Sequence, residues 1–188
     1  MKQIIAREYH RDARHFLRRF DLLPQQEFDK MGRVKNFCDL YFAAECGLKA
    51  HIFAGRSQAP AIDLYRSIRK FGGHQIRDLA TMADLLDARE VYDAVARRFE
   101  PFSVSLRYSL DAWATFFPFG LDEGDAAASY DDTVANATWL KQARDEVERL
   151  IEAATAAVTV VRQGIDAARL VAEQGELKEF VKTARIRR

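Results

Sequence analysis

The sequence is poor in the residues that most often bind metals or form disulfides, with two cysteines and four histidines among 188 residues. Cys38 and Cys46 fall on one expected helix, which places them about 12 Å apart along its axis and excludes a disulfide between them. No Cys-x-x-Cys, His-Glu-x-x-His or Glu-x-x-His motif occurs, and no glycine-rich phosphate loop. These absences exclude the common zinc, di-iron and nucleotide-loop sites, so we expect neither a metal nor a cofactor.

Long apolar runs are also missing. No stretch of about eighteen apolar residues is present and no apolar run follows the N-terminus, so we expect no membrane span, no signal peptide and a cytoplasmic setting. The formal net charge is +1, which gives no overall field that points to nucleic acid. Basic residues nevertheless gather in 1–20 and 178–188, and acidic residues gather in 122–132. Solvated helix faces and binding to an acidic surface both explain this distribution.

Apolar residues make up 48% of the chain, and they recur with the period of a helix. The pattern predicts helices near 9–20, 27–53, 57–71, 74–86, 87–99 and 131–174. Residues 101–110 alternate like a strand, but no other segment alternates with them, so irregular or helical packing is an equal alternative. We therefore expect an all-α bundle of five or six helices in 1–155, followed by a helical extension with a basic tail in 156–188.

The last predicted helix carries a heptad seam. Apolar residues recur three and four positions apart from Ala137 to Ala172, with Arg144 as the charged exception. As one continuous helix, 131–174 would span roughly 65 Å, more than the diameter of a domain of this size. It therefore either protrudes and pairs with a second copy, or bends near Gly164 and folds back along the bundle.

Two charged residues stand on or beside the apolar stripe of the predicted helix 27–53. Glu45 follows Tyr41 by four positions, and Lys49 follows Glu45 by four, which is the favourable order for an ion pair. A charged pair at the edge of a buried face needs a partner or a path to solvent. The pair is therefore either a structural ion pair at the bundle edge or part of a polar cluster that faces a groove.

Four segments resemble the motifs of HEPN domains, which are small helical bundles of nucleic-acid-associated systems. The family's Ala-Ala-Glu-x-x-Leu-Lys-Ala helix is similar to AAECGLKAHIF (43–53), and its Gly-His-x-Leu-x-x-Leu helix is similar to GHQIRDLATMADLL (73–86). The Arg-Tyr element and the final helix are similar to LRY (106–108) and to NATWLKQARDEVERLIEAA (136–154). The segments occur in family order over roughly residues 30–155, and the resemblance implies a dimerising four- or five-helix bundle.

The resemblance implies one of two functions. Many HEPN proteins are ribonucleases, with an arginine and, four to six residues later, a histidine in a site shared across the dimer. Others lack this motif and act as partners of small nucleotidyltransferases, in toxin–antitoxin-like pairs, or as binding modules. Arg107 takes the arginine's place here, but His74 is the last histidine of the chain. Because no proton acceptor for a ribose 2′-hydroxyl follows Arg107, the first hypothesis is a non-catalytic, homodimeric module that binds a protein, a nucleotide or RNA.

Two alternatives stay open. A ribonuclease would use Arg107 or Arg69 with His74. The spacing of Arg69 and His74 fits, although one such match is expected by chance in an arginine-rich chain. A structural coiled-coil protein would instead use the heptad seam. The residues expected to bind a partner are Glu45, Lys49, His74, Arg77, Arg107 and Tyr108.

The other histidines and the aromatic run near residue 115 are expected to be structural. His10, His15 and His51 are predicted on helix surfaces. The run of Trp113, Phe116, Phe117 and Phe119 is predicted in the core, in preference to a platform on which bases stack.

Overall fold

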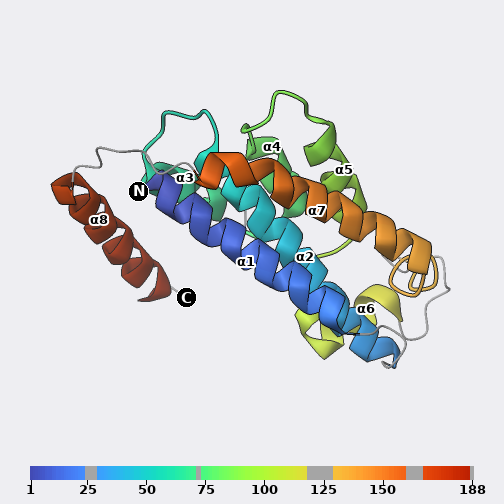
Figure 1. The fold of residues 1–188 in the computed structure, drawn as a ribbon. Coiled ribbons are helices and arrows are strands. Elements are labelled where there is room, and N and C mark those ends of the chain that lie inside the picture. The colour runs from blue at the N-terminus through green and yellow to red at the C-terminus, as the bar shows by residue number, and fades with distance from the viewer. Residues whose placement is uncertain (24–28, 71–72, 118–128, 160–166, 187–188) are drawn as a thin grey trace.

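The computed structural model describes residues 1–23, 29–70, 73–117, 129–159 and 167–186, and every regular element in these ranges is a helix. The predicted all-α class is therefore confirmed. The elements are α1 (Lys2–Leu22), α2 (Lys30–Ala54), α3 (Ala61–Lys70), α4 (Ile76–Met82), α5 (Glu90–Phe99), the 3₁₀-helix η2 (Val104–Arg107), α6 (Ser109–Phe116), α7 (Ala137–Thr159) and α8 (Ala167–Ile186) (Figure 1). None of the described helices has the length and apolarity that crossing a lipid bilayer requires.

The central helix of the bundle is α2. It is apolar on nearly all sides, and 18 of its 25 residues are buried. Both α1 and α7 pack along it, and α4 and α5 cover it elsewhere (Figure 1). Gly47 lets α7 approach closely, because a Cβ atom at this position would lie 2.9 Å from Leu150 Cδ2. In contrast, α1 has the one-sided pattern of a surface helix. Its buried residues are Ala6, His10, Ala13, Leu17 and Phe20.

An aromatic cluster joins α2 to α5 and α7. The Phe37 ring stacks on Phe99, with ring centroids 5.8 Å apart, and meets the edge of Phe102 at 4.9 Å. Trp139 of α7 lies 5.8 Å from Phe37 and 5.9 Å from Phe102. Edge and stacked contacts of this kind add to the burial energy of the rings, so the cluster fixes the end of the bundle next to α6.

Residues 101–117 form helices instead of a strand. Ser103 caps η2 through its side chain, and α6 follows directly. Alternation alone does not make a strand, because the described residues offer no second strand to pair with. Phe116 is buried as predicted, whereas Trp113 is 41% exposed and Phe119 lies outside the described residues.

The helices outnumber the prediction. Five or six were expected, whereas the described residues contain eight α-helices. One addition is α6, and the predicted helix 131–174 is divided into α7 and α8. Residues 130–135 form turns, and Asn136 begins α7 by accepting the Trp139 N–H on its Oδ1 at 3.0 Å. Gly164, the expected bend, lies outside the described residues.

The part of the heptad seam that lies on α7 is covered by the chain itself. Its buried residues are Leu140, Val147, Ile151, Ala154 and Val158. α7 packs on α1, α2 and α5, so within α7 this buried part of the seam is not open to a second copy, and Ala137 is its exposed end. Beyond α7, α8 lies against α3, where the rings of Phe180 and Tyr65 meet edge to face at 5.9 Å. The division expected after residue 155 remains a prediction.

Candidate functional site

Three of the predicted site residues meet where α2 faces the turn between α3 and α4. Glu45 and Lys49 are 5% and 6% exposed, and Lys49 Nζ lies 2.5 Å from Glu45 Oε1. His74 Nδ1 lies 3.0 Å from both carboxylate oxygens of Glu45. The carboxylate therefore bridges a lysine of its own helix and a histidine from a distant segment. We call these three residues the Glu45 cluster.

Glu45 is a carboxylate in this cluster. Burial by itself raises the pKa of Glu45, but the hydrogen bonds from His74 and Lys49 and the lysine charge outweigh burial and hold that pKa below its usual value. An imidazole nitrogen that faces a carboxylate must carry the proton and donate it, so Nδ1–H of His74 is the donor. In a neutral ring Nε2 is then the acceptor, and the His74 side chain is 46% exposed. The arrangement can orient a proton acceptor toward solvent.

Two tyrosines complete the surroundings of the cluster. The Tyr41 hydroxyl donates to the His74 carbonyl at 2.7 Å, and the ammonium of Lys49 lies 5.7 Å from the centre of the Tyr9 ring. Burial raises the pKa of both phenols above the usual value, so both are neutral. Gly73 enters the turn with φ of 75°, a conformation that favours glycine. The cluster thus anchors the turn on α2.

The two arginines nearest in sequence do not join the cluster. Arg69 lies in the last turn of α3, and the described residues show no contact between it and His74. Arg77 is exposed and pairs with Glu100 at the end of α5. The sequence spacing of Arg69 and His74 therefore does not produce a contact.

Arg107 and Tyr108 form a separate exposed pair at the corner between η2 and α6. The guanidinium carbon of Arg107 lies 4.7 Å from the centre of the Tyr108 ring, a cation–π contact. Lys35 of α2 fixes this corner by donating to the carbonyls of Leu106 and Arg107. No histidine contacts Arg107 within the described ranges.

Two histidines that were expected on the surface are buried. His51 is fully buried; its Nε2 lies 2.7 Å from the Leu150 carbonyl, and its Nδ1 lies 2.8 Å from the Tyr92 hydroxyl. His10 Nε2 lies 3.1 Å from the Ile151 carbonyl. Both rings therefore bond to neighbouring carbonyls of α7. The surface prediction is wrong for these two residues and right for His15, which is exposed.

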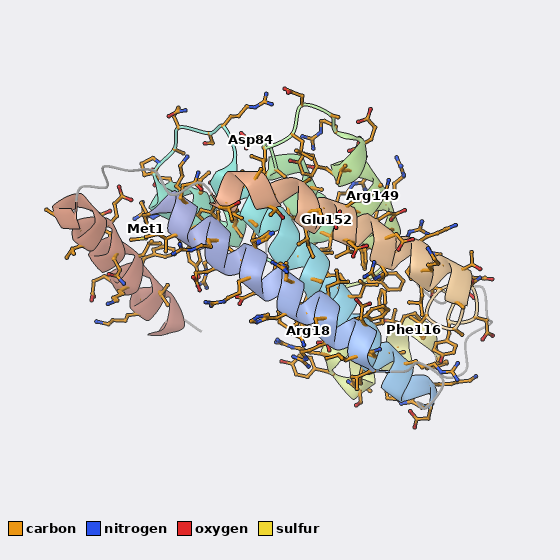
Figure 2. All side chains as sticks on the ribbon, viewed as in Figure 1. Met1, Arg18, Asp84, Phe116, Arg149 and Glu152 are labelled. Atoms are coloured by element: carbon orange, nitrogen blue, oxygen red, sulfur yellow. The ribbon has the colours of Figure 1, made fainter. Side chains whose placement is uncertain are left out.

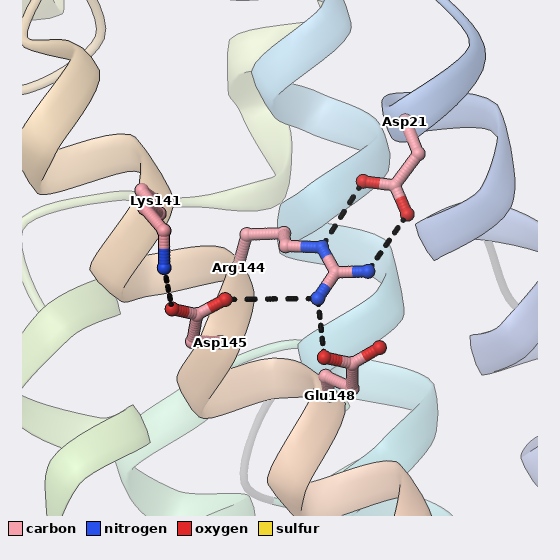
Figure 3. Close-up of polar contacts among 5 residues, drawn as sticks. All are labelled: Asp21, Lys141, Arg144, Asp145 and Glu148. Atoms are coloured by element: carbon pink, nitrogen blue, oxygen red, sulfur yellow. Dashed lines mark hydrogen bonds and ion pairs between the residues drawn. The ribbon is translucent and has the colours of Figure 1, made fainter.

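Arg144, the charged exception in the seam, bridges a groove between α1 and α7 (Figure 3). Its Nε and Nη2 lie 3.2 and 3.1 Å from the two carboxylate oxygens of Asp21, and its Nη1 pairs with Glu148. Lys141 and Asp145 extend the network, 2.6 Å apart. The hydrogen bonds to Asp21 and Glu148 raise the pKa of Arg144 above its usual value. The Arg144 guanidinium therefore joins the end of α1 to α7 through these ion pairs.

The Arg144 bridge separates two adjoining pockets. One has a volume of about 590 Å³ and a mainly apolar lining that includes Phe20, Leu23 and Leu140. The other, about 560 Å³, is lined by Arg14 and Arg18 among others. Both share Asp21 and Arg144. The described residues contain no group of three histidine, cysteine or acidic side chains that could hold a metal ion.

No protein-family model matches the chain, and no curated protein or solved structure is significantly similar to it. The HEPN resemblance therefore rests on the four sequence segments. Two of these segments meet in the structure, because Glu45 and Lys49 belong to one and His74 belongs to the other.

Proposed function

We propose that this protein is a non-catalytic helical binding module of the HEPN type. It acts as a homodimer and binds a partner, either a protein such as a nucleotidyltransferase or toxin–antitoxin partner, or a nucleotide or RNA. The observation that carries the proposal is the contact of Glu45 with His74. This contact joins two of the segments that resemble HEPN motifs, 43–53 and 73–86, and it gives the histidine of the Gly-His motif a structural role.

The geometry around Arg107 supports a binding role for this residue. Its guanidinium is exposed and held over Tyr108, where it can bind a phosphate or a carboxylate. A ribonuclease of the expected kind needs a histidine near this arginine. His74 instead directs its Nδ1 to Glu45, in the turn before α4.

Exposed apolar residues next to Arg107 support dimerisation through this corner. Tyr108, Leu110 and Trp113 are exposed by 54%, 79% and 41%. A cluster of large exposed apolar side chains is typical of a protein interface. The coiled-coil alternative lacks such support on α7, because the seam residues there are buried against α1 and α2.

The test is incubation of the full chain with a labelled structured RNA at neutral pH. We expect the RNA to stay intact. Cleavage by the wild-type protein that is abolished in both His74→Ala and Arg107→Ala would contradict the proposal. Arg149→Ala, which changes an exposed arginine of α7, serves as the matched control.

Ribonuclease activity remains the second candidate, and one observation favours it. The buried carboxylate of Glu45 holds His74 Nδ1–H and leaves Nε2 on a half-exposed ring, as in catalytic acid–base pairs. In that case Nε2 would take the proton of a ribose 2′-hydroxyl, while Arg107 or Arg69 would bind the phosphate. The same assay decides between the two candidates.

A further inference from the structure

The exposed face of α1 carries a row of arginines that lies apart from the Glu45 cluster. Arg7, Arg11, Arg14 and Arg18 follow one another at intervals of four, three and four residues, and all are exposed. This spacing keeps them on one face of the helix, where the row is about 16 Å long. The opposite face of α1 is buried in the bundle, so the row stands on a rigid support. We call these four residues the arginine row.

Most of the charge in the arginine row is uncompensated. Arg11 pairs with Glu8 and, at 4.0 Å, with Asp12. The other three members of the row form no ion pair within the part of the chain that the structure describes. A solvated helix face is usually neutralised by alternating acidic and basic residues, whereas this face has only Glu8 and Asp12 against its four arginines.

The arginine row borders the groove between α1 and α7. Arg14 and Arg18 line the pocket of about 560 Å³. Two of the three acidic residues in its lining bind Arg144 (Figure 3), which leaves Glu152 as the third. Figure 2 places Glu152 on α7 and Arg18 on α1. The lining therefore holds three arginines and three acidic residues and has no net charge, but Arg14 and Arg18 form no ion pair among the described residues and adjoin a hollow that can admit part of an anionic ligand.

The chemistry of the row favours phosphate over other partners. Guanidinium forks bind phosphate oxygens in pairs, and α1 contains arginine and no lysine after Lys2. No large apolar side chain lies between the members of the row to form the dry centre that protein interfaces require. The apolar face of α1 is buried, so the helix cannot insert into a membrane.

We propose that the arginine row binds the phosphate backbone of a nucleic acid without reading its bases. This inference rests on the proposed binding function and names the class of its partner. Duplex DNA presents a phosphate about every 3.4 Å along each strand, so a row of about 16 Å can face up to about five phosphates. Neutralising about four of them gives a plot of log affinity against log salt concentration with a slope of about −3.6.

The experiment measures binding of the full chain to a labelled duplex of about 20 base pairs by fluorescence anisotropy, between about 50 and 200 mM salt. The test variant is Arg14→Gln/Arg18→Gln. The control variant is Arg97→Gln/Arg149→Gln, which removes the same charge from exposed positions on α5 and α7. Figure 2 shows Arg149 on the α5 side of α7, away from the row. Thermal unfolding of each variant checks that the fold is intact.

We expect the test variant to bind more weakly and its salt slope to become less negative by about two units, with little change in the control. Equal weakening in both variants, or no wild-type binding at about 50 mM salt, would overturn the proposal. Binding of an acidic polypeptide in place of DNA, lost in the test variant, would also overturn it and assign the row to a protein partner. Cleavage of RNA, in contrast, would refute the proposed non-catalytic function but not the binding of phosphates by the arginine row.

Discussion

Glu45 holds together two hydrogen-bond donors from different parts of the chain. Its carboxylate accepts from Lys49 Nζ at 2.5 Å and from His74 Nδ1 at 3.0 Å. The helical spacing of four residues predicts the pairing with Lys49. The pairing with His74 joins positions 29 residues apart through the turn between α3 and α4, and no local pattern encodes it. The sequence therefore indicated all three residues as candidates but not the contact of His74 with Glu45.

Replacing Glu45 by Gln tests how far the cluster depends on its charge. The substitution leaves the ammonium of Lys49 buried without a counter-charge, which costs about 3 to 5 kcal/mol of the free energy of unfolding. Urea denaturation at pH 7 measures this. Glu100→Gln breaks the exposed pair with Arg77 and should cost less than about 1 kcal/mol. Equal losses in the two variants would show that the cluster is not buried as described.

His51 makes stability depend on pH. Burial lowers the pKa of His51 below its usual value of 6.5. As the pH falls below 6.5, the unfolded chain therefore binds a proton at this ring before the folded protein does. The stability from this residue is complete above about pH 6.5 and falls as the pH drops toward the folded pKa, by up to about 1.4 kcal/mol per pH unit.

Urea denaturation from pH 7.5 to 5.5 measures the effect. We expect His51→Gln to flatten the pH dependence, although it also lowers stability overall. His15→Gln removes an exposed ring and should leave the slope unchanged. Burial also lowers the pKa of His10, which keeps part of the pH dependence, so only a slope in His51→Gln as steep as that of the wild type would refute the role of His51.

The burial of the two histidines follows from patterns that the sequence does contain. His51 lies on α2, which is apolar on nearly all sides, so any polar residue on this helix was a candidate for burial. His10 lies four residues after Ala6 and three before Ala13, within the buried stripe of α1. Their partners, the carbonyls of α7, could not be predicted because periodicity does not tell which helices pack together.

At the scale of helices, the contact between α2 and α7 depends on Gly47. A Cβ atom there would lie 2.9 Å from Leu150 Cδ2, and Leu150 is fully buried. We expect Gly47→Val to destabilise the protein by about 1 to 3 kcal/mol, although valine favours a helix more than glycine does. At Gly175 on α8 no atom lies within 4 Å of the added Cβ, so Gly175→Val should be neutral or slightly stabilising. The same sign of change in both variants would contradict the close approach.

Helices with one apolar face could be predicted from the sequence, including the short α3 and α5, whereas η2 and α6 could not. The prediction near 9–20 fell within α1, which buries a single stripe. The apolar residues of 104–116 match neither the helical nor the strand period clearly. The reason is that a 3₁₀-helix followed by a two-turn helix places apolar residues at irregular intervals. The long seam was a good guide to the buried face of α7 but not to its partner, since a seam has the same sequence within a chain as between chains.

At the scale of the whole molecule, the corner at Arg107 is the surface through which we expect the chain to dimerise. Leu110→Asp places a charge in the centre of that apolar surface and should convert a dimer to a monomer without loss of fold, because Leu110 is 79% exposed. Light scattering coupled to gel filtration measures the mass. Val171→Asp, at an exposed position on α8, is the control. A dimer that persists in Leu110→Asp would remove this surface from the account.

Incubation with RNA is the most direct test of whether the protein binds without catalysing. A labelled structured RNA is mixed with excess full-length protein at pH 7.5, and its length is followed by denaturing gel while a native gel reports binding. Wild type, His74→Ala, Arg107→Ala and Arg149→Ala are compared. We expect RNA of unchanged length in all four reactions. Shortened RNA with wild type and Arg149→Ala, but not with His74→Ala or Arg107→Ala, would contradict the proposed function and assign His74 and Arg107 to a ribonuclease site.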